Sequence, residues 1–370
     1  MIALRIAVGL LALVGILLVL GSVVRTVVVP RAVTARLARV AFLGVHRLLI
    51  FRLWLTGSSD YATRDRVFSL QAPLGIFAQL FTWAVSLFLC FAALFWALLP
   101  SHVNGPSISR AVELSGSSML TLGYESPHGL VRQLAGFAAA GIGLTLLALV
   151  ITYLPTLYAA FARREAVITK LSVRTGAPPS GPKLLAESWK LGRFDQLEEV
   201  WDVWEDWFIE VGEAQTTFPQ LGWFRSPRAH NHWVLAAESV LDGAALFITA
   251  CAVPRQSRSE LCLNAGVHAL NSIADFGGIP HHPPEPDAEI LLSREQFDAA
   301  LDGLAELGVP LRGDRDEVWG AFRMTRARYE SVVAVLGRMT DAPRGEWSSW
   351  SETSPRHMPP LFGGVTARRE

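Results

Sequence analysis

Three long runs of apolar residues, each without a charged residue, dominate the first half of the chain. They are Ile6–Val24, Leu74–Leu99 and Leu134–Leu154. A helix rises about 1.5 Å per residue, so about 20 apolar residues cross the roughly 30 Å hydrocarbon core of a bilayer. The pattern therefore predicts three transmembrane helices.

The first run also permits a second interpretation, a cleaved signal peptide, because Arg5 precedes it. Such peptides have an apolar region of about 7–15 residues and a small-residue cleavage site. Ile6–Val24 is longer and no clear site follows it. A retained helix is the favoured interpretation.

The pattern changes after Pro155, where polar residues return. Residues 156–174 are expected to carry the third helix onward, and Thr175–Pro182, rich in Pro and Gly, predicts a turn or linker. One apolar stripe at steps of three and four supports the helix that follows. Its members are Leu197, Trp201, Trp204, Phe208 and Val211. Helices are expected over about 183–213, 228–253, 258–276, 293–307 and 315–339.

Trp233–Val253 is apolar enough to be taken for a fourth span. Glu238 and Asp242 lie within it, one helical turn apart. A carboxylate at the centre of a membrane helix costs about 2.5–3.5 kcal/mol on insertion scales. A helix buried in the core of a soluble domain fits this stretch better.

These patterns divide the chain into four parts. Residues 1–73 hold the first span and a basic segment, and 74–155 hold the other two spans and the loop between them. Residues 156–340 form a helical domain, and 341–370, rich in Ser, Pro, Gly and Arg, read as a disordered tail. The predicted fold class is an all-α membrane protein with a helical cytosolic domain.

Composition agrees with a membrane protein. Of 370 residues, 51% are hydrophobic and 18% are charged, which is too apolar for an ordinary soluble chain. Acidic and basic residues balance, so net charge does not indicate a nucleic-acid partner. Only three bases are Lys, and Ala and Gly are abundant, which suggests a GC-rich bacterial genome.

The distribution of Arg predicts an orientation in the inner membrane. Segment 25–73 carries eight Arg, whereas the loop 100–133 carries only Arg110 and Arg132. The positive-inside rule therefore places segment 25–73 and the C-terminus in the cytoplasm and the loop outside. The N-terminus would also lie outside, which Arg5 opposes weakly.

Residues 33–54 predict a basic amphipathic helix suited to the inner-leaflet surface. Arg52 departs from the pattern, and a helix packed against its neighbours is an equal alternative. Four basic residues fall on roughly one side of this helix: Arg36, Arg39, His46 and Arg47.

The loop between the second and third spans contains the parts of an ion filter in order. Asn104–Ser107 is a turn with helix-start residues, and Ser109–Leu120 has the length of a short pore helix. Thr121–Tyr124, TLGY, then follows, and Ser126-Pro127 leads to the third span. Potassium-type filters aim the carbonyls of four such loops at a central axis, where they replace the hydration shell of the ion.

Each filter residue has a distinct expected role. Thr121 supplies a hydroxyl and a carbonyl, Leu122 packs backward while its carbonyl faces the pore, and Gly123 permits a turn that other residues resist. Tyr124 braces the filter and contributes the last carbonyl. A bare T-x-G-Y occurs by chance, so an ordinary extracellular loop is the alternative, and position between two spans favours the filter.

The arrangement span, pore helix, TLGY, span resembles the two-span pore module of the potassium-channel superfamily. The resemblance continues through ITYLPTLYAAFARRE (151–165) and RTGAPPS (174–180). It also includes WEDWFIEVGEAQTTFPQLGWF (204–224), RSPRAHNHW and ESVLDGAAL. These stretches are similar to bacterial potassium-channel-family membrane proteins with a helical cytosolic domain, over roughly residues 70–280. The resemblance implies a pore-forming subunit, and one loop per chain implies a homotetramer.

The chain departs from the superfamily filter T-V-G-Y-G in two places. Leu122 replaces Val, which is a mild change, and Glu125 replaces the second Gly. Four Glu125 carboxylates would form an anionic ring at the outer mouth that attracts cations and also binds divalent ions. The expected permeant ion is therefore K⁺ or another monovalent cation.

The remaining candidate residues permit two interpretations each. Gly136, Gly141 and Gly143 in the third span suit either a gating hinge or close helix packing. Cys90, Cys251 and Cys262 have no metal-site spacing and are expected to be reduced.

The histidines follow no zinc pattern, and no nucleophile motif occurs, so neither a metal, a cofactor nor an enzyme is predicted. A membrane enzyme that uses Glu238, Asp242 and His268 is a remote alternative. Two interpretations remain: a cation channel, whose cytosolic domain assembles the tetramer or senses an unknown ligand, and a membrane scaffold or sensor with a silent pore.

Overall fold

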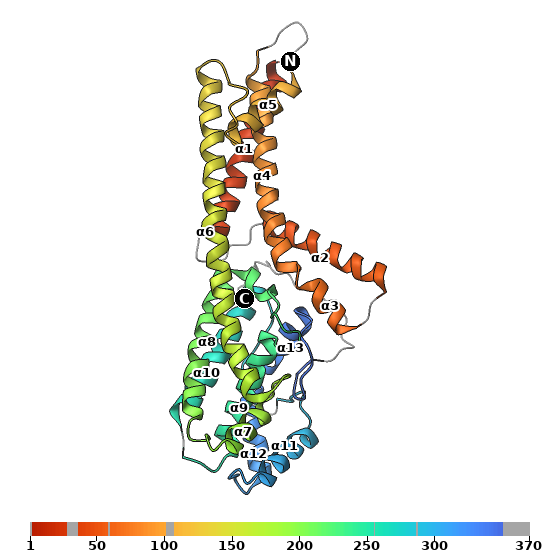
Figure 1. Ribbon diagram of the computed structural model, residues 1–370, viewed down its shortest axis with the longest axis vertical. Coiled ribbons are helices and arrows are strands. Elements are labelled where there is room, and N and C mark those ends of the chain that lie inside the picture. Colours follow the sequence, from red (N-terminus) through yellow and green to blue (C-terminus); the bar gives the residue numbers. More distant parts are fainter. Residues whose placement is uncertain are drawn as a thin grey trace. The chain divides into compact units, whose positions relative to one another are not determined.

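The computed structural model describes residues 2–27, 36–57, 60–100, 107–254, 256–285 and 288–350. These residues form helices and no strand, apart from an isolated bridge between Cys251 and Leu311 (Figure 1). The all-α fold class is confirmed for this part of the chain. The chain forms two compact units. The first comprises Met1–Phe51 with Pro73–Tyr158, and the second comprises Arg52–Ala72 with Ala159–Glu370.

The helices of the first unit are long and apolar. Among the residues that the structure describes, four stretches are long and apolar enough to cross a membrane: Ile2–Val27, Tyr61–Leu98, Leu130–Thr175 and Trp233–Ala250. In the last of these, 94% of the apolar window is buried inside the protein, against at most 33% in the others. The three sparsely buried stretches expose apolar surface to their surroundings, which identifies a membrane protein.

Helices α1 (Ile2–Val27) and α4 (Gln71–Leu98) pack closely in the first unit. A Cβ added at Gly15 would lie 2.7 Å from the Cys90 sulfur. The absence of a side chain at Gly15 therefore lets the two helices pack closely at this point. The Trp83 indole donates a hydrogen bond of 3.2 Å to Ser22 Oγ. Arg5 donates to the carbonyls of Ala97 and Leu99 at the C-terminal end of α4. The negative end of the helix dipole stabilises this cation.

Helix α2 (Arg36–Thr56) covers most of the predicted basic helix. Residues 33–35 and the side chains of 36–39, which include two of its predicted basic residues, lie outside the described part of the chain. Gly75 lets α2 approach the start of α4, since a Cβ there would lie 2.5 Å from the Phe42 ring. One face of α2 is buried through Phe42, Val45, Leu49 and Leu53.

Helix α6 (Leu130–Thr175) continues through Pro155 without ending. The predicted continuation over 156–174 is therefore observed. Its first part belongs to the first unit and its last part, from Ala159, to the second.

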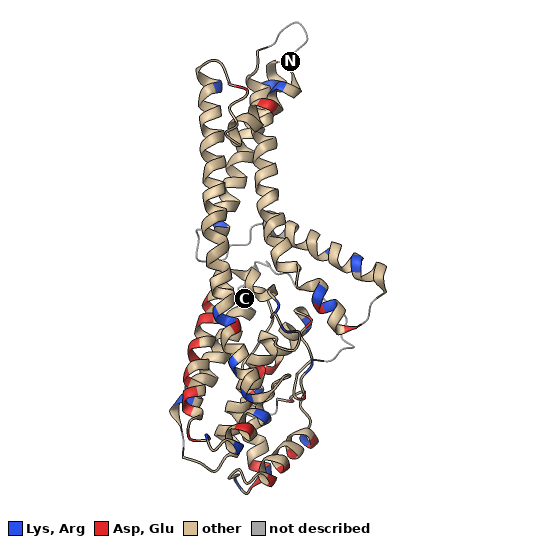
Figure 2. Cartoon of the chain, in the orientation of Figure 1, with Lys and Arg blue, Asp and Glu red and all other residues tan. Residues whose placement is uncertain are grey.

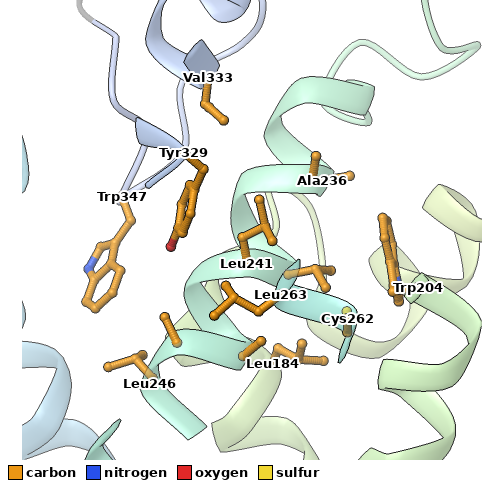
Figure 3. Packing of buried hydrophobic residues seen from close by; sticks show 14 of the residues in the cluster. Leu184, Trp204, Ala236, Leu241, Leu246, Cys262, Leu263, Tyr329, Val333 and Trp347 are labelled. Carbon is orange, nitrogen blue, oxygen red and sulfur yellow. The ribbon is translucent and has the colours of Figure 1, made fainter. Parts of the chain in front are cut away.

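The second unit is built around helix α9 (Trp233–Ala250), whose side chains are almost all buried. Helices α7, α10, α12 and α13 pack against it. Figure 3 shows Leu241, Leu263 and Cys262 gathered between Trp204 and Tyr329. The other bounds are α3 (Tyr61–Phe68), α7 (Gly181–Lys190), α8 (Leu197–Thr217), η1 (Pro219–Trp223), α10 (Ser257–Gly277), α11 (Arg294–Glu306), α12 (Arg315–Arg326) and α13 (Glu330–Met339).

The structure interrupts two of the predicted helices. The stretch 183–213 breaks between α7 and α8, where Gly192 adopts φ +64°, a left-handed conformation typical of helix ends. The stretch 315–339 breaks between Arg326 and Glu330. The predicted stripe on α8 is correct, because all five of its residues are buried.

Two observed boundaries differ from the predicted ones. Residues 52–72 belong to the second unit, where Arg225 pairs with Asp65 at 2.6 Å. Ordered packing also continues past Asp341, where the predicted tail begins. Trp347 and Trp350 are buried, and the Trp350 indole donates to Ala342 O at 3.1 Å. Residues 351–370 of that tail lie outside the described part of the chain.

Candidate functional site

Helix α5 (Ile108–Met119) corresponds to the predicted pore helix. Its N-cap is Ser107, whose hydroxyl accepts from the Arg110 N–H at 3.3 Å. Residues 101–106, which include most of the predicted turn, lie outside the described residues. Ser115 is fully buried and donates a hydrogen bond of 2.8 Å to the Phe88 carbonyl of α4. This bond sets the depth of α5 along α4.

The C-terminal end of α5 lies deep between α4 and α6. Phe88 is ten residues before Leu98, the last residue of α4, and Gly143 is thirteen residues after Leu130, the first residue of α6. At 1.5 Å per residue, these distances are about 15 Å and 20 Å along the two helices. The segment between the helices therefore extends about 15–20 Å along them before the chain turns back.

Two of the three candidate hinge glycines contact this segment. A Cβ at Gly143 would lie 2.0 Å from the Met119 carbonyl oxygen, and one at Gly136 would lie 2.9 Å from Pro127 Cγ. Gly141 has no atom within 4 Å of its Cβ position. Close packing is therefore the local role of Gly136 and Gly143.

The predicted filter, Thr121–Tyr124, folds back on the end of α5. Thr121 and Gly123 have positive φ angles of +52° and +74°. A positive φ is unusual for Thr, and this backbone strain costs about 1–3 kcal/mol at Thr121. The Leu122 N–H donates to the Ser117 carbonyl at 2.9 Å. Leu122 and Tyr124 are 60% and 64% exposed, so in the single chain neither packs backward. The expected bracing by Tyr124 is not made within one chain.

Glu125, the residue that departs from the superfamily pattern, is held on both sides. The Ser117 hydroxyl donates to the Glu125 carbonyl at 2.7 Å and accepts from its N–H at 3.1 Å. Its carboxylate forms an ion pair of 3.2 Å with Arg110. Sequence analysis missed Arg110 as a partner of Glu125, although Arg110 lies in the first turn of α5.

The two carboxylates of α9 face a buried arginine. Glu238 and Asp242 pair with Arg326 of α12, which is fully buried (Asp242–Arg326, 2.8 Å). Burial lowers the pKa of Arg326, but Asp242 and Glu238 outweigh it and raise the pKa. Glu330 also pairs with Arg326. The Tyr329 hydroxyl donates to Asp242 at 2.7 Å, and the backbone N–H of Ser349 donates to Glu238 at 3.0 Å. The cluster is a structural network.

The histidines have separate structural positions. His232 is buried, and its Nδ1 accepts from the Val234 N–H at the start of α9. Burial, with Arg225 and Arg164 nearby, holds its pKa well below the usual value. His230 stacks on Tyr61. In the described part of the chain, no group of three His, Cys, Asp or Glu could hold a metal ion.

The three cysteines are free thiols. Cys251 and Cys262 are buried, which raises the pKa of both, and Cys90 is half-buried in α4. A buried thiol with a raised pKa is a poor nucleophile.

Comparison of the chain with known proteins gave no match to a protein-family model, to a curated protein or to a solved structure.

Proposed function

We propose that this protein is the pore-forming subunit of a homotetrameric cation channel with Thr121–Tyr124 as its filter. The observation that carries the proposal is the depth of α5 and its following segment between α4 and α6. A membrane loop with this backbone geometry needs burial in protein or a water-filled path. The resemblance of the segment to potassium-type filters supplies the second support.

In this proposal α1, α4 and α6 cross a bacterial inner membrane and α9 does not. α9 is buried in the second unit, and its carboxylates are paired with Arg326. The excess of Arg in 25–73 places the second unit and the C-terminus in the cytoplasm. Arg5, which opposed this orientation, has partners at the outer end of α4. Figure 2 supports the division, because charged residues are sparse along α1, α4 and the upper part of α6.

Four copies are required because each chain carries one filter segment. In the single chain Leu122 and Tyr124 are exposed, and a central fourfold axis would cover them with neighbouring copies. Their carbonyls would then form rings that coordinate K⁺ or another monovalent cation.

Glu125 shapes the outer mouth in a way that its sequence position alone does not predict. Its ion pair with Arg110 gives each chain one positive and one negative charge there. The expected anionic ring is thereby weakened, and divalent block depends on how firmly Arg110 holds the carboxylate.

Membrane lipid is the proposed partner of α2. On the side of this helix away from its buried face, Leu48, Phe51, Trp54 and Leu55 are exposed. Arg47 and Arg52 are also exposed. A helix with exposed Leu, Phe and Trp beside Arg fits the interface of the inner leaflet.

A silent pore is the second candidate, and the Arg110–Glu125 ion pair favours it. Such a pair next to the filter could close the outer end of the path. The protein would then be a membrane scaffold or sensor, and its second unit would bind a cytosolic ligand or partner.

The test is potassium flux through purified protein in liposomes. We expect the wild-type protein to conduct potassium and the Gly123→Asp variant not to conduct it. The backbone at position 123 has φ +74°, which suits glycine, so a side chain there should disturb the filter. Glu125→Gln, which keeps the side-chain shape, should change divalent block while flux persists. A well-folded tetramer without flux at any voltage would support the silent pore, and a strict monomer in mild detergent would sink both the filter and the channel.

A further inference from the structure

Two rows of opposite charge run along the surface of the second unit. On α6, Arg163, Lys170 and Arg174 are exposed and repeat at steps of seven and four, which places them on one face of the helix. On α8, the exposed residues Asp202, Asp206 and Glu213 repeat at steps of four and seven. Figure 2 shows the acidic residues along α8.

The two rows match when the helices are opposed in antiparallel directions. Glu213 then faces Arg163, Asp206 faces Lys170 and Asp202 faces Arg174, with every pair at the same level. The same register brings Val173 opposite Val203, and both of these apolar side chains are exposed.

Within one chain this register is not available. The Trp207 indole donates to the Arg164 carbonyl at 3.2 Å, which sets the level of α8 against α6. In that antiparallel arrangement Lys170 lies level with Trp201, five residues or about 7.5 Å from Asp206. Arg163 pairs with Glu210 instead of Glu213, and Asp202 pairs with Arg258. Among the described residues Lys170, Arg174, Asp206 and Glu213 have no ion-pair partner.

We infer that the charged row of α8 docks on the charged row of α6 of a second copy of this chain. The occupant is a second copy because one chain carries both complementary rows in a register that it cannot satisfy internally. A rotation axis parallel to the helices keeps α6 of one copy antiparallel to α8 of the next, which is the orientation that the register requires. A fourfold rotation about such an axis would repeat the contact around a ring of four second units, so the inference rests on the proposed tetramer.

Exposed ion pairs contribute little affinity, and their role here is to set which face meets which. The rows would fix the rotational position of the second units while the pore supplies most of the assembly. The contact is heterologous, so four copies close a ring with four identical contacts.

The experiment uses full-length protein in membranes with Lys170→Cys and Asp206→Cys together. A short bis-maleimide should join neighbouring chains and shift the protein to dimer, trimer and tetramer masses on a denaturing gel. The matched control combines Arg174→Cys with Glu213→Cys, which lie on the same two rows. In the proposed register position 213 is eleven residues, or about 16 Å, from the residue that faces position 174. This control should therefore stay at monomer mass. Each single variant controls for the native thiols.

The outcomes separate the inference from the channel proposal. Tetramers in mild detergent without cross-linked species would overturn the docking alone, as would cross-linking that stops at the dimer, since a ring continues to four. Equal cross-linking of both pairs would show that the register is wrong. A monomer in detergent would overturn the docking together with the tetramer.

Discussion

At the scale of single residues, three glycines of one helix have different surroundings. Gly143 lies against the Met119 carbonyl, Gly136 lies against Pro127, and Gly141 faces open space. A hinge and a packing contact look alike in a sequence, because both need a small residue. The contact with Met119 shows that one of these positions seats the end of α5.

The first prediction compares Gly143→Ala with Gly141→Ala. The added methyl at position 143 would overlap the Met119 carbonyl, so α5 must shift, and we expect loss of flux and of tetramer in detergent. The methyl at 141 meets nothing in the chain and is the control. Both variants are measured by liposome flux and by mass in mild detergent. Loss of flux at 141 with a normal tetramer would instead support a hinge there.

At the scale of elements, α2 separates two kinds of apolar residue. Phe42, Val45 and Leu49 are buried, whereas Leu48 and Phe51 are exposed. The alternatives of a packed helix and a membrane-surface helix therefore both describe part of the observed helix.

The second prediction follows from neighbouring exposed residues of α2. A nitroxide at Phe51→Cys should be more accessible to oxygen than to a polar nickel chelate in liposomes, because the apolar face enters the interface. At Arg52→Cys the preference should reverse or weaken, since this position turns toward the headgroups. Equal accessibility to the polar reagent at both positions would contradict lipid contact.

Helix boundaries show where periodicity stops being informative. The apolar stripe predicted α8 correctly, yet the stretch 183–213 continues through Gly192 in the sequence pattern and breaks there in the structure. The break at 327–329 has no glycine or proline to announce it. Tertiary packing of Tyr329 in the core, with its hydroxyl on Asp242, accompanies that turn.

At the scale of the whole molecule, the buried Arg326 joins distant parts of the second unit. Its guanidinium reaches α9 through Asp242, α13 through Glu330 and the C-terminal segment through the Trp347 carbonyl. Ordered packing of 341–350, where the sequence predicted a tail, depends on this network and on the burial of Trp347 and Trp350.

The third prediction is that Arg326→Met destabilises the second unit by about 3–5 kcal/mol, because it leaves buried carboxylates without their cation. Arg328→Met is the control, since Arg328 is only half-buried and donates to the neutral Asn264 Oδ1 at 2.8 Å, and it should change stability by about 0.5 kcal/mol or less. Denaturant unfolding followed by tryptophan fluorescence measures both. Equal stability of the two variants would show that Arg326 does not hold the unit together.

The sequence by itself determined the apolar helices, the length of α5 and the order of the residues Thr121–Tyr124 that follow it. These are local properties, because hydrophobic spacing and helix-start residues act within a few turns of the chain. Only the tertiary structure decided the depth of α5, the Arg110–Glu125 ion pair and the buried cation that Glu238 and Asp242 face. Each of these joins residues brought together by packing, which no pattern along the chain records.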